Sequence, residues 1–217
     1  MADNSTTVWL ARHGEVHNPA RVLYGRLPRM QLSPEGRRQA RALAEFLGPR
    51  PLAAIYSSPM LRARRTAGTV QASHPSLQRV RIDADLQEIH TGWQGQPLEV
   101  LERIGYDFYA HPHAPDDESL PMIRDRMLRW LQRVLRRHAG SEVLGVSHGD
   151  PILILAGTLS GLQLAPESIF PRPYIGTGVV YRMQFDSQGG CRDVQLLVPP
   201  LSPAAAEQAP DENEAAA

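Results

Sequence analysis

Short apolar, β-branched runs alternate with stretches of helical periodicity over the first 198 residues of the chain. Runs of this length are typical of strands that are buried on both faces of a sheet. The runs that predict strands are residues 6–11, 53–56, 80–82, 142–147, 179–185 and 194–198. The last two flank Gly189-Gly190, a turn pair that favours a β-hairpin.

Between the strands, apolar residues recur at helical spacing behind good N-terminal residues. Ser33-Pro34 predicts a helix start, because serine caps the first amides and proline fits the first turn; this helix extends to Leu47. Three more helices are expected, from Ser58-Pro59 to about Ala72, behind Ser119-Leu120-Pro121, and from Asp150-Pro151. Strands that alternate with helices predict an α/β fold with a mostly parallel sheet and helices on both faces.

Two histidines stand where such a sheet binds its ligands, beyond the carboxyl ends of the strands. His13 follows the first strand in Arg12-His13-Gly14, and His148 follows the strand 142–147 in His148-Gly149. Glycine lets the backbone pass close to a ligand. A lone histidine is more often structural or solvated, but two His-Gly pairs at one sheet edge favour a functional site.

Three further residues complete a candidate site. Arg62 lies one turn into the second helix, Asn18 shares the loop of His13, and Glu88 precedes a Gly-Trp loop. Each has a plain alternative: a surface arginine, a turn residue before Pro19, and an exposed loop acid. Together, arginines, imidazoles and backbone amides could stabilise a phosphoryl group in transfer without a metal. A neutral histidine could attack phosphorus, and a carboxylic acid could protonate the leaving oxygen.

With these residues in place, the chain resembles branch 1 of the histidine phosphatase superfamily, the phosphoglycerate mutase-like proteins. Five blocks carry the resemblance, in family order and spacing. They are LARHGEVHN (10–18), LSPEGRRQARAL (32–43), IYSSPMLRARRTA (55–67), LQEIHTGWQGQP (86–97) and VSHGDPI (146–152). The resemblance implies a three-layer α/β/α sandwich on a six-stranded, mostly parallel sheet, within a single domain over residues 1–198.

The resemblance also implies roles. His13 would accept the phosphoryl group, and Glu88 would act as general acid for the leaving group and then as base for water. The groups that would hold the phosphate are His148, Arg12, Arg62, Asn18 and the Gly149 amide. Neither a metal nor an organic cofactor is implied, and the expected partner is a small phosphorylated metabolite.

The loop after the first block departs from the family pattern. Val16 stands where threonine is frequent, and residues 25–31 lack the aspartate that often precedes the helix. The charged and aromatic residues of this loop could meet an anionic part of the substrate or be solvated; they are Arg21, Tyr24, Arg26 and Arg29.

The segment 92–97 is of the short type found in the phosphatase branch, which favours a phosphomonoester hydrolase over a phosphomutase. A non-catalytic phosphate-binding module is the remaining alternative, although the complete residue set speaks against it. A cap is expected over 97–120, where Asp116-Asp117-Glu118 would disfavour a second phosphate. Four aromatic residues could pack there or contact an organic leaving group, namely Trp93, Tyr106, Phe108 and Tyr109.

Composition and charge limit the chemistry, the partners and the location that we expect for the protein. All 23 basic residues are arginine, which excludes lysine chemistry, and they balance 23 acids in a 217-residue chain. Zero net charge argues against nucleic-acid binding. The Ala-, Pro- and acid-rich residues 199–217 predict a disordered tail, and their removal leaves a mildly cationic body. The lone Cys191, the absence of a leader peptide and the lack of a long apolar segment predict a cytoplasmic protein without a membrane span, either monomer or homodimer.

Overall fold

The computed structural model describes residues 5–171 and 173–201. One six-stranded sheet has the order β3-β2-β4-β1-β5-β6. Its strands are β1 (Thr6–Arg12), β2 (Leu52–Ser57), β3 (Arg81–Ile82), β4 (Glu142–Ser147), β5 (Val180–Phe185) and β6 (Cys191–Leu197). The pairs β1–β4, β4–β2 and β2–β3 are parallel, whereas β5 runs antiparallel to both β1 and β6. The prediction of a mostly parallel sheet is confirmed.

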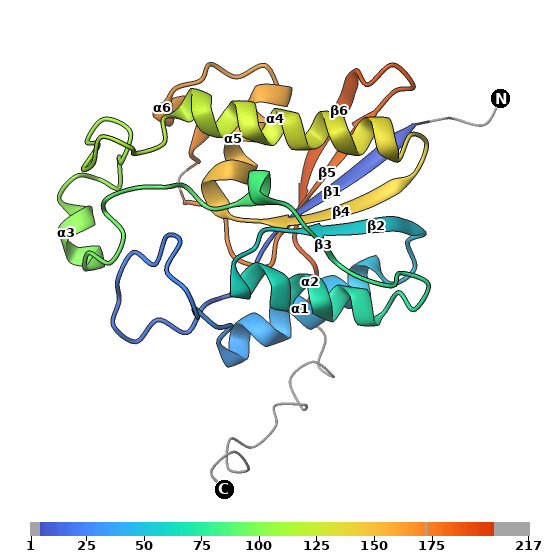
Figure 1. Cartoon of the computed structure of the whole chain (residues 1–217), viewed down its shortest axis with the longest axis horizontal. Helices are drawn as coiled ribbons and strands as arrows, with labels where there is room; N and C mark the ends of the chain where they lie inside the picture. The colour runs from blue at the N-terminus through green and yellow to red at the C-terminus, as the bar shows by residue number, and fades with distance from the viewer. Residues whose placement is uncertain (1–4, 172, 202–217) are drawn as a thin grey trace, which may run out of the picture.

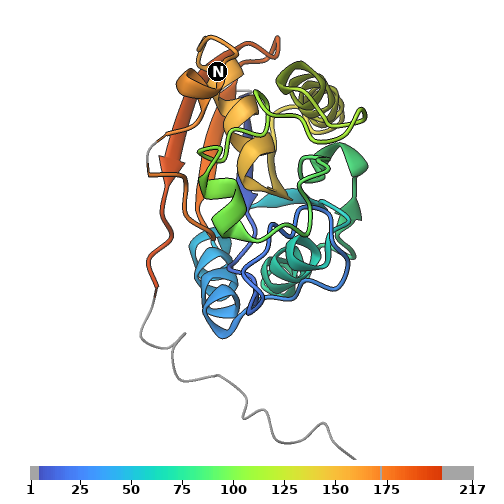
Figure 2. The ribbon, with the colours of Figure 1, turned by 90° about the vertical axis from the view of Figure 1, so that its left-hand side faces the viewer.

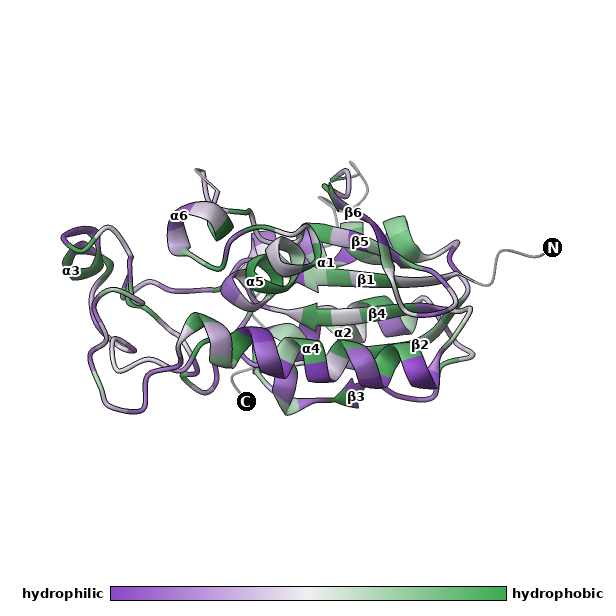
Figure 3. Ribbon diagram, turned by 90° about the horizontal axis from the view of Figure 1, so that it is seen from above, coloured by the Kyte–Doolittle hydropathy of each residue, from purple (hydrophilic) through white to green (hydrophobic). Residues whose placement is uncertain are grey.

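Helices cover both faces of this sheet, as predicted for a three-layer sandwich. The long helices are α1 (Pro34–Leu47), α2 (Leu61–Ala72), α4 (Leu120–Arg137) and α5 (Gly149–Leu159). Figure 1 shows α1 and α2 on one face and α4 and α5 on the other. Three short elements were not predicted: η1 (Ala84–Leu86), α3 (Leu98–Glu102) and α6 (Pro166–Ile169). In Figure 3, α3 lies beyond the ends to which β1 and β4 run.

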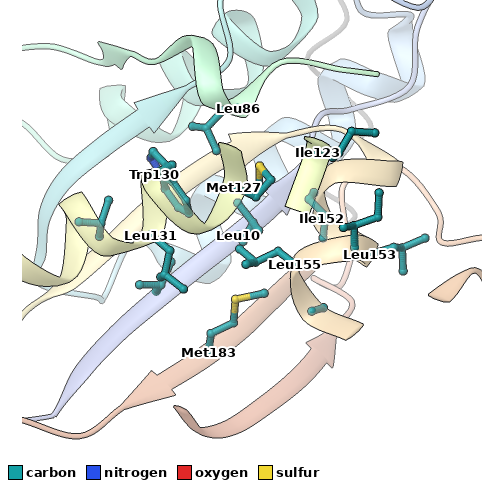
Figure 4. Close-up of a cluster of buried hydrophobic side chains, with 14 of the residues drawn as sticks. Leu10, Leu86, Ile123, Met127, Trp130, Leu131, Ile152, Leu153, Leu155 and Met183 are labelled. Carbon is teal, nitrogen blue, oxygen red and sulfur yellow. The ribbon is translucent and has the colours of Figure 1, made fainter. Parts of the chain in front are cut away.

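Two hydrophobic clusters hold the layers together, and β1 contributes to both because its side chains alternate between faces. Val8 and Leu10 join the cluster under α4 and α5, while Trp9 and Ala11 join the one under α1 and α2. Figure 4 shows Leu10 among Met127, Trp130 and Leu155 in the first cluster. The strand that ends at the candidate site is therefore anchored on both sides.

One predicted helix start is wrong. The helix after β2 begins at Leu61, with Met60 as its N-cap, and not at Ser58-Pro59. The Ser58 amide instead donates to Val146 O at 2.9 Å and so prolongs the pairing of β2 with β4. By contrast, Ser33 caps α1 as predicted, accepting from the Gly36 amide at 3.0 Å.

No helix within the described ranges combines the length and apolar character needed to cross a bilayer. The predicted disordered tail falls, from residue 202 onward, outside the described residues.

Two glycines let the loop after β1 lie directly against the start of α1. A Cβ on Gly36 would collide with the backbone of Glu15, and a Cβ on Gly14 would collide with the backbone of Gly36. Backbone atoms cannot swing away as a flexible side chain can, so this contact requires glycine on both sides. The position of the His13 loop is thereby fixed against α1.

Gly36→Ala should lower the free energy of unfolding by about 1–3 kcal/mol, the usual cost of overpacking. Gly68→Ala in α2 is the matched control, because its added Cβ would meet nothing within 4 Å. That control should be neutral or stabilising by up to about 1 kcal/mol, since alanine favours a helix more than glycine does. Urea denaturation of both variants measures the difference, and equal stabilities would contradict the close contact.

Candidate functional site

The register of the sheet brings the two histidines together. Arg12 pairs with Ser147 at the ends of β1 and β4, so His13 and His148 leave the sheet side by side. Their ring centroids are 5.0 Å apart, and both residues are fully buried. Figure 2 shows this end of the molecule toward the viewer, with α3 and the loop between β1 and α1 in front of the sheet. The predicted juxtaposition is present in the structure.

Arg62 joins the two imidazoles. It lies in the first turn of α2, fully buried, and its Nε donates to His13 Nε2 at 3.1 Å. Its Nη2 donates to His148 Nδ1 at 3.0 Å and to the Gly25 carbonyl at 2.7 Å. The surface-arginine alternative is thereby excluded for Arg62.

These hydrogen bonds define which ring nitrogens carry a lone pair. His13 Nδ1 lies 2.7 Å from the Gly14 carbonyl, which can only accept, so this nitrogen carries the hydrogen and Nε2 the lone pair. Burial, then the charges of Arg62 and Arg12, holds the pKa of His13 well below its usual range. Burial and Arg62 likewise lower the pKa of His148. Both imidazoles are neutral at physiological pH, and Nε2 of His13 has the electron pair of a nucleophile.

Two guanidinium N–H groups at the site have no hydrogen-bond partner among the described residues. They are Arg62 Nη1 and Arg12 Nε, and both are buried. A buried donor without a partner is costly, particularly on a charged group. The rest of Arg12 is held by its hydrogen bond to the Ile175 carbonyl. The arrangement therefore leaves two buried cationic donors near His13 that an anion could satisfy.

Glu88 lies at the edge of this cluster, and its side chain is 14% exposed. The alternative that Glu88 is an exposed loop acid is thereby excluded. Its Oε2 is 3.6 Å from His148 Nδ1 and 4.0 Å from Arg62 Nη2. Burial, followed by the negative charge of Asp150, raises the pKa of Glu88 to about 7, against the opposing charge of Arg62. A carboxyl with this pKa can donate or accept a proton near neutral pH.

Arg126, which was not singled out from the sequence, anchors the backbone of the loop that carries Glu88. Arg126 is 5% exposed and donates to the carbonyls of Asp85 and Gln87, each at 2.7 Å. Glu118 accepts from Arg126 at 2.9 Å and from Arg26 at 2.8 Å. The signal was present in the sequence, because Arg126 is three residues after Ile123 and four before Trp130, on the apolar face of α4.

The remaining predicted phosphate ligands differ in their placement. Gly149 is the first residue of α5, so its amide belongs to a helix N-terminus, which attracts anions. Asn18 is not in the cluster: its side chain donates to the Val22 carbonyl at 2.9 Å and accepts from the Val22 amide at 3.3 Å. It closes the loop as the turn-residue alternative describes, and a phosphate-binding role for Asn18 stays a prediction.

The charged residues of the first loop and of the cap have structural partners. Arg21 pairs with the exposed Glu99 at 3.1 Å, and Arg26 pairs with Glu118. Asp117 accepts from the backbone amides of Gly92, His113 and Ala114 and so shapes the cap. The acids 116–118 would disfavour a second phosphate if they faced the site, but none of them is among the residues that line the cleft described below.

Aromatic and acidic residues cover the cluster, and two of them, Tyr174 and Asp150, were not singled out from the sequence. The Tyr24 ring lies 4.7 Å from the Arg62 guanidinium, and the Tyr174 ring lies 5.2 Å from that of Arg12. Asp150 accepts hydrogen bonds from the hydroxyls of Tyr109, at 2.7 Å, and of Tyr174. Asp150 directly follows the His148-Gly149 pair, so its position in the sequence could have marked it.

The donor set suits an anion better than a metal ion. His13, Glu88 and His148 each offer one ligand atom, and these atoms lie within 4.8 Å of one another. Arg62, however, donates to the nitrogen lone pair of each imidazole. A divalent cation at these atoms would lie against the positive charge of this buried guanidinium, whereas a phosphate would be attracted by that charge and could accept from the free Nη1.

Comparisons with known proteins agree with this chemistry. The sequence model of the "Histidine phosphatase superfamily (branch 1)" matches residues 8–193. An uncharacterized protein of Mycobacterium tuberculosis is 36% identical over 73% of this chain and 81% of its own length. Phosphoserine phosphatase 1 of Hydrogenobacter thermophilus is 33% identical over 72% of this chain and 77% of its own. The solved mycobacterial glucosyl-3-phosphoglycerate phosphatase superposes with a TM-score of 0.74 at 26% identity, covering 91% of this chain and all of that one, 100%.

The raised pKa of Glu88 predicts a pH-dependent stability. An unfolded glutamate ionises near pH ~4.3, but folded Glu88 does so only at about 7, so the free energy of unfolding should fall as the pH rises between these values. The loss should approach about 3 kcal/mol. Glu88→Gln removes the ionisable group and with it this loss. In urea denaturation, the free energy of unfolding of the variant should therefore rise relative to that of the wild type between pH 5 and pH 8.

Glu45→Gln, an exposed substitution on α1, is the matched control and should follow the wild type at both pH values. A constant difference between wild type and Glu88→Gln at the two pH values would contradict the raised pKa.

Proposed function

Because the chain belongs to branch 1 of the histidine phosphatase superfamily, we propose that it is a metal-independent phosphomonoester hydrolase that acts through a phosphohistidine on a small phosphorylated metabolite. The observation that carries the proposal is the buried, neutral His13, whose Nε2 accepts from Arg62 Nε, while Nη1 of the same guanidinium has no hydrogen-bond partner among the described residues. A nucleophile and an anion-binding group thus lie in direct contact.

In the first step, Arg62 Nε turns from His13 Nε2 to an oxygen of the phosphoryl group, the freed Nε2 attacks phosphorus, and the bond to the ester oxygen breaks. Arg62 Nη1, Arg12 Nε and the Gly149 amide stabilise the charge on the equatorial oxygens. Protonated Glu88 gives its proton to the leaving oxygen, so the alcohol departs neutral. Its pKa of about 7 keeps a large share of the carboxyl protonated at neutral pH.

In the second step, Glu88, now ionised, takes a proton from water as the oxygen attacks the phosphohistidine. The P–N bond breaks, inorganic phosphate leaves, and neutral His13 is restored with Glu88 protonated. His148 keeps its orientation through the hydrogen bond between its Nε2 and Ser58 Oγ at 2.8 Å. In both steps the neutral imidazole of His148 lies beside the transferred phosphoryl group.

A phosphomutase would need to hold a second anionic group of the same substrate. The cleft beyond Arg12 is lined by Glu102, Asp107 and Glu167, which oppose such a group. A non-catalytic module would have no use for a carboxyl whose pKa is raised to about 7 next to the phosphate position. Hydrolysis therefore has the stronger support of the three alternatives.

His13→Ala should abolish phosphate release from p-nitrophenyl phosphate, by ~10⁴-fold or more, because losing a nucleophile has effects of that order. Wild-type activity should persist in EDTA. His17→Ala, an exposed histidine in the same loop, is the matched control and should keep full activity.

Rapid quenching with radiolabelled substrate should trap a phosphoenzyme that survives alkali and is lost in acid, as phosphohistidine is. Loss of activity in EDTA would contradict the metal-independent mechanism. Absence of phosphate release from any ester would turn the assignment to a phosphomutase or a binding module.

Glu88→Gln should lower kcat/KM for alkyl phosphates by ~10²–10⁴-fold, and much less for p-nitrophenyl phosphate, whose leaving group needs no proton. In the wild type, kcat/KM for alkyl esters should fall as the pH rises above about 7, where Glu88 loses its proton. The variant should lack this limb of the pH profile. Equal slowing across all leaving groups would remove Glu88 from the role of general acid.

A further inference from the structure

A cleft of about 1100 Å³ opens beside the candidate site, and both Arg12 and Glu88 line it. Pockets of this size enclose ligands as large as a typical drug molecule. The phosphoryl group itself needs only the small space between the arginines and His13. The cleft is therefore the place of the alcohol part of the ester, and it has room for a large one.

Aromatic rings from separate segments form one wall of this cleft. Tyr109 of the cap stacks on Phe170, with centroids 5.6 Å apart and planes at 11°, and Phe170 lies 6.3 Å from Tyr174. Tyr24, Tyr106 and Phe108 line the cleft as well. Trp93 does not: its indole N–H donates to the His111 carbonyl and its ring stacks on His113.

Two rings of this wall are more exposed to solvent than aromatic residues that pack in a core. Tyr174 is 42% exposed and Tyr106 is 45% exposed, although both are large aromatic residues. Clustered aromatic surface of this kind marks a binding groove. A flat ring placed against it would gain apolar burial together with stacking.

Among the described residues, the charges that line the cleft away from the phosphate position are all negative. Arg12 is the single basic residue of the lining that the structure describes, and it belongs to the phosphate site. Glu102, Asp107 and Glu167 line the cleft without an arginine partner in the salt bridges of the described residues. Asp150 adds a fourth acid beside Glu88, although two tyrosine hydroxyls donate to it. A carboxylate or a second phosphate in this cleft would face net repulsion.

We propose that the substrate of this site is a phosphomonoester whose alcohol carries an aromatic ring and is neutral or cationic, and that anionic alcohols are rejected. The proposal rests on the proposed hydrolase function. It separates this chain from two relatives, whose names contain phosphoserine and glucosyl-3-phosphoglycerate, both of which carry a carboxylate. A cationic group would gain from the acids and from the π-faces of the wall.

Three aryl phosphates of matched length test the charge preference: 4-(2-aminoethyl)phenyl, 4-(2-hydroxyethyl)phenyl and 4-(carboxymethyl)phenyl phosphate. The methylene groups insulate the phenol from the charge, so the leaving groups are similar. We expect kcat/KM for the cationic and neutral esters to exceed that of the anionic ester at least tenfold. Hydrolysis of the anionic ester as fast as the neutral one would overturn the inference.

The double variant Glu102→Gln/Glu167→Gln should narrow the ratio between the neutral and the anionic ester, while Glu45→Gln on α1 should leave that ratio at the wild-type value. An unchanged ratio in the double variant would overturn the assignment to these acids. Arg172 is outside the described residues; an anion preference that Arg172→Gln abolishes would also count against the inference.

Benzyl and cyclohexylmethyl phosphate test the aromatic wall, because both release an alkyl alcohol of similar size. Benzyl phosphate should have the lower KM, and Phe170→Leu should remove this advantage. Equal KM values in the wild type would overturn the aromatic part of the inference. If none of the neutral esters is hydrolysed, the hydrolase function itself fails, which is a different result from hydrolysis without discrimination.

Discussion

The buried guanidinium of Arg62 organises the centre of this molecule. It donates to both histidines and to the Gly25 carbonyl, and so connects β1, β4, α2 and the first loop through one planar group. Burying a charge is costly unless other groups compensate it. Here the compensation is incomplete, because Nη1 has no partner among the described residues and Glu88 is 4.0 Å away. Under the proposed function, a bound dianion would supply the missing compensation, so phosphate binding and the electrostatic balance of the fold would be coupled.

Much of this arrangement could be predicted from the sequence, because the strongest patterns are local. The apolar strands, the Ser33 cap and the face of α4 follow from residue spacing alone. His13 and His148 could be placed together because parallel strands that pair in register end at the same edge. What could not be predicted depends on a long-range contact: the Ser58 amide donates to Val146 O, so Ser58 continues β2 instead of starting a helix.

The walls of the cleft were the least predictable part. Residues of the cap and of the segment after α5 meet only through tertiary packing, as in the stacking of Tyr109 on Phe170. Acids close in sequence, such as Asp116 and Asp117, hold the cap together and are absent from the lining of the cleft. Acids distant in sequence line the cleft instead. Sequence patterns locate residues that share an element, but they do not show which loops will face each other.

The two histidines follow strands that are hydrogen-bonded to each other over six residue pairs and anchored in both hydrophobic clusters. Most of the cleft lining, by contrast, comes from loops and from the short helices α3 and α6. Amide hydrogen exchange differs between such parts, because core strands open only with global unfolding and loops open locally. The position of the two histidines is thus as durable as the sheet, while the walls of the cleft can open locally, and can change over generations of mutation, without loosening the histidine pair.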